Sequence, residues 1–146
     1  MLKRGSELPV NDHVMRYVSP NRLRRDENHN VIGFLPQAFS LRENETSLSV
    51  NWLEYFGQDL KISGKQSVLT FRSSLQLSKS SVFGIARVGK VKELSQRSGK
   101  PVRVVYDPTR SNRSHSLIKV VQPEDQALLE AMAVEFWSTN IKNSGV

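Results

Sequence analysis

Two of the three histidines have the residue types around them that acid–base chemistry needs. His13 and His115 each stand at the start of a predicted strand, with Asp12 beside the first and Asp107 before the second. Because imidazole titrates near neutral pH, two histidines can act as general base and acid on a phosphodiester without a metal. An arginine such as Arg16, Arg110 or Arg113 could stabilise the charge that develops on phosphate. This hypothesis takes His13, Arg16 and His115 as catalytic residues; the alternative is two strand-end histidines bonded to polar neighbours.

The loop before His115 is also basic, with Arg110 and Arg113 leading into the triplet Ser114-His115-Ser116. It belongs to one of two basic blocks. The chain of 146 residues has a net charge of +7. Residues 1–25 carry +4 and residues 84–121 carry +7, whereas residues 26–83 carry −1 and residues 122–146 carry −3. Clustered basic charge is typical of proteins that bind a polyanion. A solubilising surface is the other interpretation.

We therefore expect a nucleic acid as partner, held through its phosphates with little sequence preference. The residues expected to contact phosphate are Arg22, Arg24, Arg25, Arg87, Lys90, Lys92, Arg103, Arg110, Arg113 and Lys119.

Several classes of site are excluded by the sequence. There are no cysteines, so a disulfide scaffold, a cysteine nucleophile and a thiolate zinc site are excluded. The nucleotide-binding patterns GxxxxGK[ST] and GxGxxG, the zinc motif HExxH and the serine-hydrolase elbow GxSxG do not occur. We expect neither a metal nor a cofactor.

The chain contains no apolar run of the roughly 18 residues that a membrane span needs. Its first residues also lack the apolar region of a signal peptide. We expect a cytoplasmic protein with no membrane partner.

The candidate catalytic and phosphate-binding residues must be positioned by a single α+β domain over residues 1–146, in which we expect residues 1–11 and 141–146 to be flexible. Hydrophobic patterning predicts about five mostly antiparallel strands and two or three helices, with the C-terminal helix packed on the sheet. The strands are expected at 12–19, 47–52, 81–89, 101–107 and 115–121, and the helices at 65–76, 90–99 and 123–140.

The segment NWLEYF brings together Trp52, Tyr55 and Phe56. Aromatic residues that stack on bases usually lie among basic residues, and here the neighbours are Leu53 and Glu54. The segment therefore favours the core or a docking surface, which leaves a protein–protein interaction module as a further alternative.

The patterns HVMRYV, LSVNWLEYF and DPTRSNRSHS resemble those of a group of short uncharacterised bacterial proteins with an HVxRxV start, an LSVxWxEYF middle and a DP…SHS ending. The resemblance covers most of the chain. It implies a bacterial cytosolic protein from an accessory, mobile-element or defence gene set, and it assigns no site.

The order of His13 or Arg16 followed by Ser49 is similar to small ADP-ribosyltransferase-like domains, whose catalytic glutamate or glutamine has no recognisable counterpart here. The function expected first is nucleic-acid binding, alone or as an accessory subunit of a larger complex. The alternatives are the small enzyme and the interaction module described above.

Overall fold

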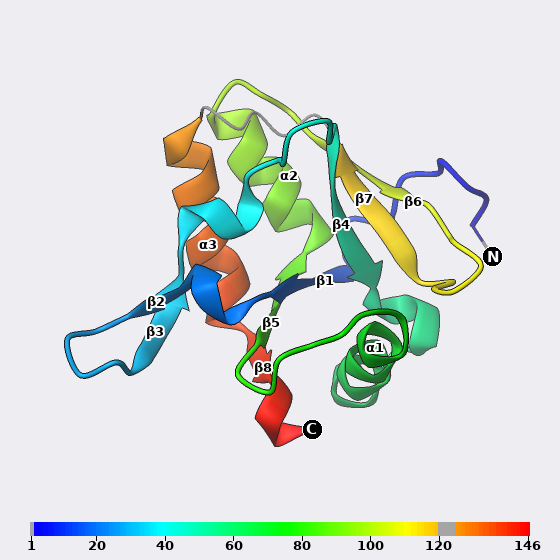
Figure 1. Cartoon of the computed structure of the whole chain (residues 1–146). Helices are drawn as coiled ribbons and strands as arrows, with labels where there is room; N and C mark the ends of the chain where they lie inside the picture. The colour runs from blue at the N-terminus through cyan, green and yellow to red at the C-terminus, as the bar shows by residue number, and fades with distance from the viewer. Residues whose placement is uncertain (1, 120–124) are drawn as a thin grey trace.

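The chain forms a six-stranded antiparallel sheet with helices on both faces (Figure 1). The computed structural model describes residues 2–119 and 125–146. The strand order is β6-β7-β4-β1-β5-β8, and β2 and β3 form a separate hairpin. The strand bounds are β1 His13–Val18, β2 Leu23–Arg25, β3 Val31–Phe34, β4 Ser47–Trp52, β5 Val82–Arg87, β6 Arg103–Tyr106, β7 His115–Lys119 and β8 Asn140–Lys142.

The helices are α1 Leu60–Ser74, α2 Val88–Arg97 and α3 Gln126–Ser138. Aspartates cap α1 and α3, because the Asp59 carboxylate accepts hydrogen bonds from two backbone N–H groups of the first turn and Asp125 accepts one. Short 3-10 turns include η2 Pro36–Phe39 and η3 Leu53–Phe56. Within residues 2–119 and 125–146, no helix is long and apolar enough to cross a membrane.

The alternating side chains of the central strands separate two apolar cores. Val14 and Val18 of β1 belong to the larger core, together with residues of α2 and α3. Met15, the residue after Val14, packs on the opposite face with Phe71 of α1 and Phe83 of β5. This alternation fixes the face of the sheet on which each polar side chain of β1 and β4 lies.

The α+β class, the antiparallel sheet and the packing of α3 on it confirm the prediction. The described residues form eight strands, more than the five expected. The additional strands, β2, β3 and β8, are only three or four residues long, too short for alternation to be recognised. The first residues expected in the C-terminal helix, and the last two of the fifth predicted strand, lie outside the described residues.

Strands β1 and β4 pair only at one end, and we call their divergence the fork. The paired residues are Val14 with Trp52 and Met15 with Asn51, and Figure 1 shows the two strands separating beyond that point. Arg16, the residue after Met15, bridges the gap between the two strands, because its Nη1 donates to the Ser49 carbonyl at 2.9 Å. The fork thus leaves an opening in the middle of the sheet.

Candidate functional site

The opening at the fork is a cavity of about 320 Å³, which we call the fork cavity. Three arginines line it from three segments: Arg16 from β1, Arg22 from the turn after β1, and Arg42 from the loop before β4. Glu45 is the only carboxylate among its described lining residues. Ser49 lines it from β4. The lining therefore carries an excess of positive charge.

Two of the arginines are held in place by backbone carbonyls. Arg16 donates to the Ala38 carbonyl from Nε at 3.2 Å and from Nη2 at 3.0 Å, and Arg22 donates to the carbonyl of Gln37. The Arg42 side chain is exposed. Since carbonyl oxygens carry no full charge, these contacts orient the guanidinium groups without neutralising them.

The pKa of Arg16 is lowered from its ordinary value to about 10, mainly by burial and in smaller part by the positive charges of Arg22 and Arg42. Glu45 acts in the opposite direction. Arg16 remains protonated at neutral pH, but in an environment that penalises its charge. An anion in the fork cavity would offset that penalty.

His115 contacts both Asp107 and Ser49. Its Nδ1 lies 2.8 Å from the Asp107 carbonyl oxygen and 3.2 Å from Oδ2 of the same residue. Its Nε2 lies 3.1 Å from Ser49 Oγ. The hydroxyl at the edge of the fork cavity is therefore in direct contact with an imidazole that an aspartate holds.

The loop that leads into β7 is fixed by a buried network of amides and hydroxyls. Asn112 donates from Nδ2 to Asn51 Oδ1 at 2.7 Å, and its Oδ1 accepts from Ser114 N at 3.1 Å and Ser114 Oγ at 2.6 Å. Asn51 in turn donates to Ser67 Oγ of α1 at 3.1 Å. Because the network ties the loop to β4 and α1, it fixes the start of β7 and therefore His115.

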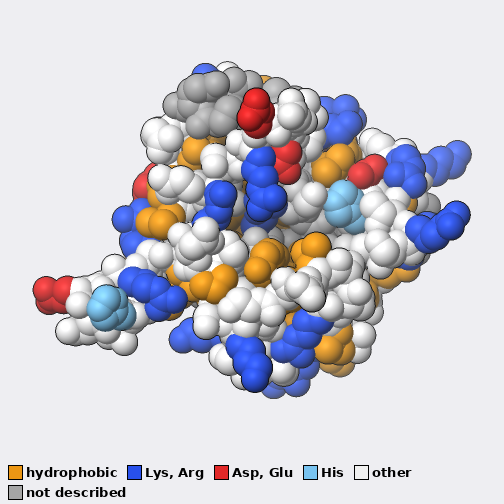
Figure 2. Space-filling view, in the orientation of Figure 1, with side chains coloured by type: hydrophobic (Ala, Val, Ile, Leu, Met, Phe, Trp, Pro, Cys, Tyr) orange, Lys and Arg blue, Asp and Glu red, His pale blue; other side chains and the backbone are white. Residues whose placement is uncertain are grey.

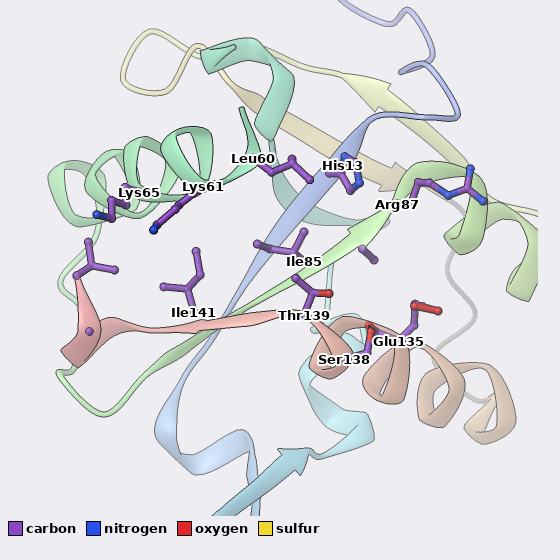
Figure 3. A pocket seen from close by; sticks show the side chains of 13 residues that line it. His13, Leu60, Lys61, Lys65, Ile85, Arg87, Glu135, Ser138, Thr139 and Ile141 are labelled. Carbon is purple, nitrogen blue, oxygen red and sulfur yellow. Dashed lines mark hydrogen bonds between the residues drawn. The ribbon is translucent and has the colours of Figure 1, made fainter. Parts of the chain in front are cut away.

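His13 lines a different cavity, of about 520 Å³, between α1, β5, β8 and the end of α3 (Figure 3). Its partner is Glu54 of η3, which accepts from His13 N at 2.7 Å and lies 2.7 Å from His13 Nδ1. The Glu54 side chain is only 6% exposed. The acidic neighbour Asp12 instead accepts from the indole N–H of Trp52 at 2.9 Å.

The walls of the His13 cavity are mainly apolar with a basic side. Figure 3 shows Lys61 and Lys65 on α1, with Ile141 and Ile85 between that helix and Thr139. The two lysines are one helical turn apart on an exposed face. This second cavity suits a small molecule with an apolar body.

The structure therefore brings together two of the three residues expected to be catalytic. Arg16 and His115 both contact Ser49, one at its carbonyl and the other at its hydroxyl. His13 has its own carboxylate and its own cavity, so the two histidines do not meet at one site. Asp107 is the partner expected for His115, whereas Ser114 and Ser116 are buried in the polar network and β7.

Sequence reasoning missed Arg42 and Glu54 as site residues, and it named Ser49 only in the comparison with ADP-ribosyltransferase-like domains. Ser49 is on the polar side of the alternating strand 47–52, which marks it as outward-facing, but the strand that pairs with β4 cannot be read from that pattern. Glu54 contacts His13 only because the 3-10 turn η3 returns along β1.

The ten basic residues expected to contact nucleic acid are spread over several elements. Three form ion pairs: Arg24 with Glu130 at 3.0 Å, Lys90 with Glu93 at 3.8 Å and Lys92 with Glu7 at 3.3 Å. Three donate to backbone carbonyls: Arg22 to Gln37, Arg25 to His29 and Arg87 to Val10. Arg22 lines the fork cavity, Arg110 and Arg113 are exposed in the loop before β7, and Arg103 lies opposite Lys119 on paired strands.

Figure 2 shows one face of the molecule, with Lys and Arg side chains near its middle and at its edges and fewer acidic side chains among them. Strand register places Lys119 opposite Ser47, on the same side of the sheet as Ser49 and His115. Arg103 and Lys119 therefore extend the basic surface from the fork cavity toward the edge of the sheet.

Among the described residues, no group of three or more His, Asp or Glu side chains is arranged to hold a metal ion. Comparisons of the chain with protein-family models, with curated proteins and with solved structures find no match.

Proposed function

We propose that this protein binds the phosphate groups of single-stranded nucleic acid, alone or as a subunit of a larger complex, with the fork cavity as the main contact site. The observation that carries the proposal is the convergence of Arg16, Arg22 and Arg42 on one concave space whose described lining holds a single carboxylate, that of Glu45. Guanidinium groups are well suited to phosphate, because their planar forks can donate two parallel hydrogen bonds.

The electrostatic state of Arg16 supports an anionic ligand. Burial is the main cause of its lowered pKa, so the fold tolerates a charged group where its charge is disfavoured. A bound phosphate would supply the missing negative charge. The backbone carbonyls of Ala38 and Ser49 already fix the orientation of the guanidinium, so little side-chain entropy is lost on binding.

The surroundings of the cavity favour a flexible polymer over an isolated phosphate. Arg103 and Lys119 continue the basic surface along the sheet, and Arg110 and Arg113 are exposed beside it. A single strand can bend one phosphate into the cavity while its neighbours contact these side chains. Contacts of this kind position the polymer and do not read its sequence.

The test is fluorescence anisotropy with labelled RNA and DNA single strands of about 12 nucleotides over a series of salt concentrations. Binding should weaken steeply with salt. Arg22→Ala and Arg42→Ala should each weaken it about tenfold and should reduce the log–log salt slope by about 0.7. These two side chains are chosen because Arg16 also bridges the fork.

The matched control is Arg97→Ala, which removes the same charge from α2, where Arg97 pairs with Glu93. It should leave the slope nearly unchanged. A flat salt dependence in the wild type would reject nucleic-acid binding through phosphates. Equal losses in all three variants would reject the fork cavity as the contact site.

A further inference from the structure

Asp107, His115 and Ser49 form a connected array at the edge of the fork cavity. The Nδ1 atom of His115 faces two acceptors of Asp107, the carbonyl oxygen at 2.8 Å and Oδ2 at 3.2 Å. Neither acceptor can donate when the carboxylate is ionised, so Nδ1 must carry the proton. In the neutral ring Nε2 is then the acceptor, and the Ser49 hydroxyl donates to it at 3.1 Å.

This hydrogen-bond direction is the one that activates a serine. A base that accepts from the hydroxyl can take its proton as the oxygen attacks, and a third group that holds the base keeps its tautomer fixed. Here the carboxylate of Asp107 and its carbonyl both hold Nδ1. Asp107 is a positioning residue in this array, and Ser49 and His115 would be the residues that react.

The array is held rigidly at His115 and is accessible to a ligand at Ser49. The Asn112 side chain ties the loop before β7 to Asn51, and β4 and β7 pair in register with Asn51 opposite His115. The His115 side chain is 19% exposed. Ser49 is exposed and lines the fork cavity, so its oxygen can meet a ligand.

The neighbours of Ser49 specify the kind of electrophile. Arg16 donates to the carbonyl of Ser49 itself, and Arg22 and Arg42 line the same cavity. Guanidinium groups stabilise the charge spread over the oxygens of a transferring phosphoryl group. A phosphorus centre therefore fits the cavity better than an uncharged carbonyl does.

We propose that Ser49 is a nucleophile toward the phosphorus of a phosphate ester bound in the fork cavity, with His115 as general base and acid. In the first step the Ser49 Oγ–P bond forms, the bond from phosphorus to the leaving alcohol oxygen breaks, and the serine proton passes through His115 Nε2 to that oxygen. In the second step water attacks phosphorus, the Oγ–P bond breaks, and a water proton returns to Ser49 through His115. The proposal rests on the proposed phosphate site and adds chemistry to it.

The first experiment uses a fluorophosphonate probe on the full chain, with intact mass and peptide mapping as readout. This probe phosphonylates activated serines and needs no nucleic-acid binding. We expect a single adduct on Ser49, absent in Ser49→Ala and slowed at least about 100-fold in His115→Gln. Labelling should also be slower at about pH 5 than at about pH 8, because a protonated imidazole cannot accept the hydroxyl proton.

The matched control is Ser47→Ala, two residues away on the same side of β4 and opposite Lys119. It should be labelled like the wild type. Asp107→Asn should slow labelling and alter its pH dependence, a change that a purely structural role would not produce. Thermal unfolding of each variant shows whether the fold is intact; if His115→Gln does not fold, Ser49→Ala and the pH dependence carry the test.

The second experiment measures release of 4-nitrophenol from bis(4-nitrophenyl) phosphate, which Ser49→Ala should abolish. Absence of labelling, labelling at another residue, or turnover that survives Ser49→Ala would overturn the proposal. The anisotropy assay separates the two hypotheses. Oligonucleotide binding without Ser49 labelling supports the phosphate site and rejects Ser49 as a nucleophile. Ser49 labelling without oligonucleotide binding supports the nucleophile and rejects the nucleic-acid-binding site.

Discussion

Replacement of Asn112 by alanine should destabilise the protein more than the loss of an ordinary loop side chain would. The substitution removes the partner of three buried groups: Asn51 Oδ1, the Ser114 N–H and the Ser114 hydroxyl. Asn51 and Ser114 are both 0% exposed, so water does not reach these groups without a rearrangement. Each unsatisfied buried group costs about 1–3 kcal/mol. The free energy of unfolding should therefore fall by at least about 3 kcal/mol, a large share of the roughly 5–15 kcal/mol typical of a folded domain.

Urea unfolding followed by tryptophan fluorescence measures this change, and calorimetry should show a melting temperature lower by about 6–12 °C. Asn28→Ala is the matched control, because Asn28 is exposed and its contact to Asp26 is made by the backbone N–H. That control should stay within about 0.5 kcal/mol of the wild type. A loss below about 1 kcal/mol in Asn112→Ala would refute the view that the amide network holds the loop.

Two further substitutions test packing and ionisation. Gly84→Ala should lower the free energy of unfolding by about 1–3 kcal/mol. The reason is that a Cβ at this position would lie 2.6 Å from Phe34 Cε2 and 2.8 Å from the Phe136 carbonyl. Unchanged unfolding in urea would contradict this close packing of α3 on β5. Burial raises the pKa of Tyr106, whose hydroxyl donates to the Arg113 carbonyl at 2.8 Å. As the pH rises, the unfolded chain therefore loses the Tyr106 proton before the folded chain does. The stability that Tyr106 adds relative to Tyr106→Phe should be present below about pH 10 and decline above it. A stability difference that stays constant across that range would show that the hydroxyl is not buried in this way.

The sheet could be predicted from the sequence wherever one face of a strand is buried. The expected strand 47–52 coincides with β4, because Leu48, Val50 and Trp52 alternate with polar residues. The helix expected at 65–76 begins earlier, at Leu60, because Asp59 caps it and Gly64 permits close contact with β8. Short strands such as β8 depend on a neighbour for their hydrogen bonds, so no local pattern reveals them.

The site could be predicted only in part, for a similar reason. The sequence indicated His115, Asp107 and Arg16 as residues capable of chemistry, and the structure joins Arg16 and His115 through Ser49 and places Asp107 against His115. Their meeting point, Ser49, depends on the pairing of β4 with β7 and on the divergence of β4 from β1. Strand order and a split between strands arise from the whole sheet and leave no signature in the spacing of residues.

The bridging role of Arg16 makes the stability of the fold and the occupancy of the fork cavity thermodynamically linked. The same guanidinium closes the gap between two strands and faces the proposed ligand. A ligand present at about 100 times its dissociation constant adds about 2.7 kcal/mol to the free energy of unfolding when it binds only the folded state. Phosphate ions from a buffer would then stabilise the folded state by binding in the fork cavity. The protein would show a higher melting temperature in phosphate than in a chloride solution of the same ionic strength.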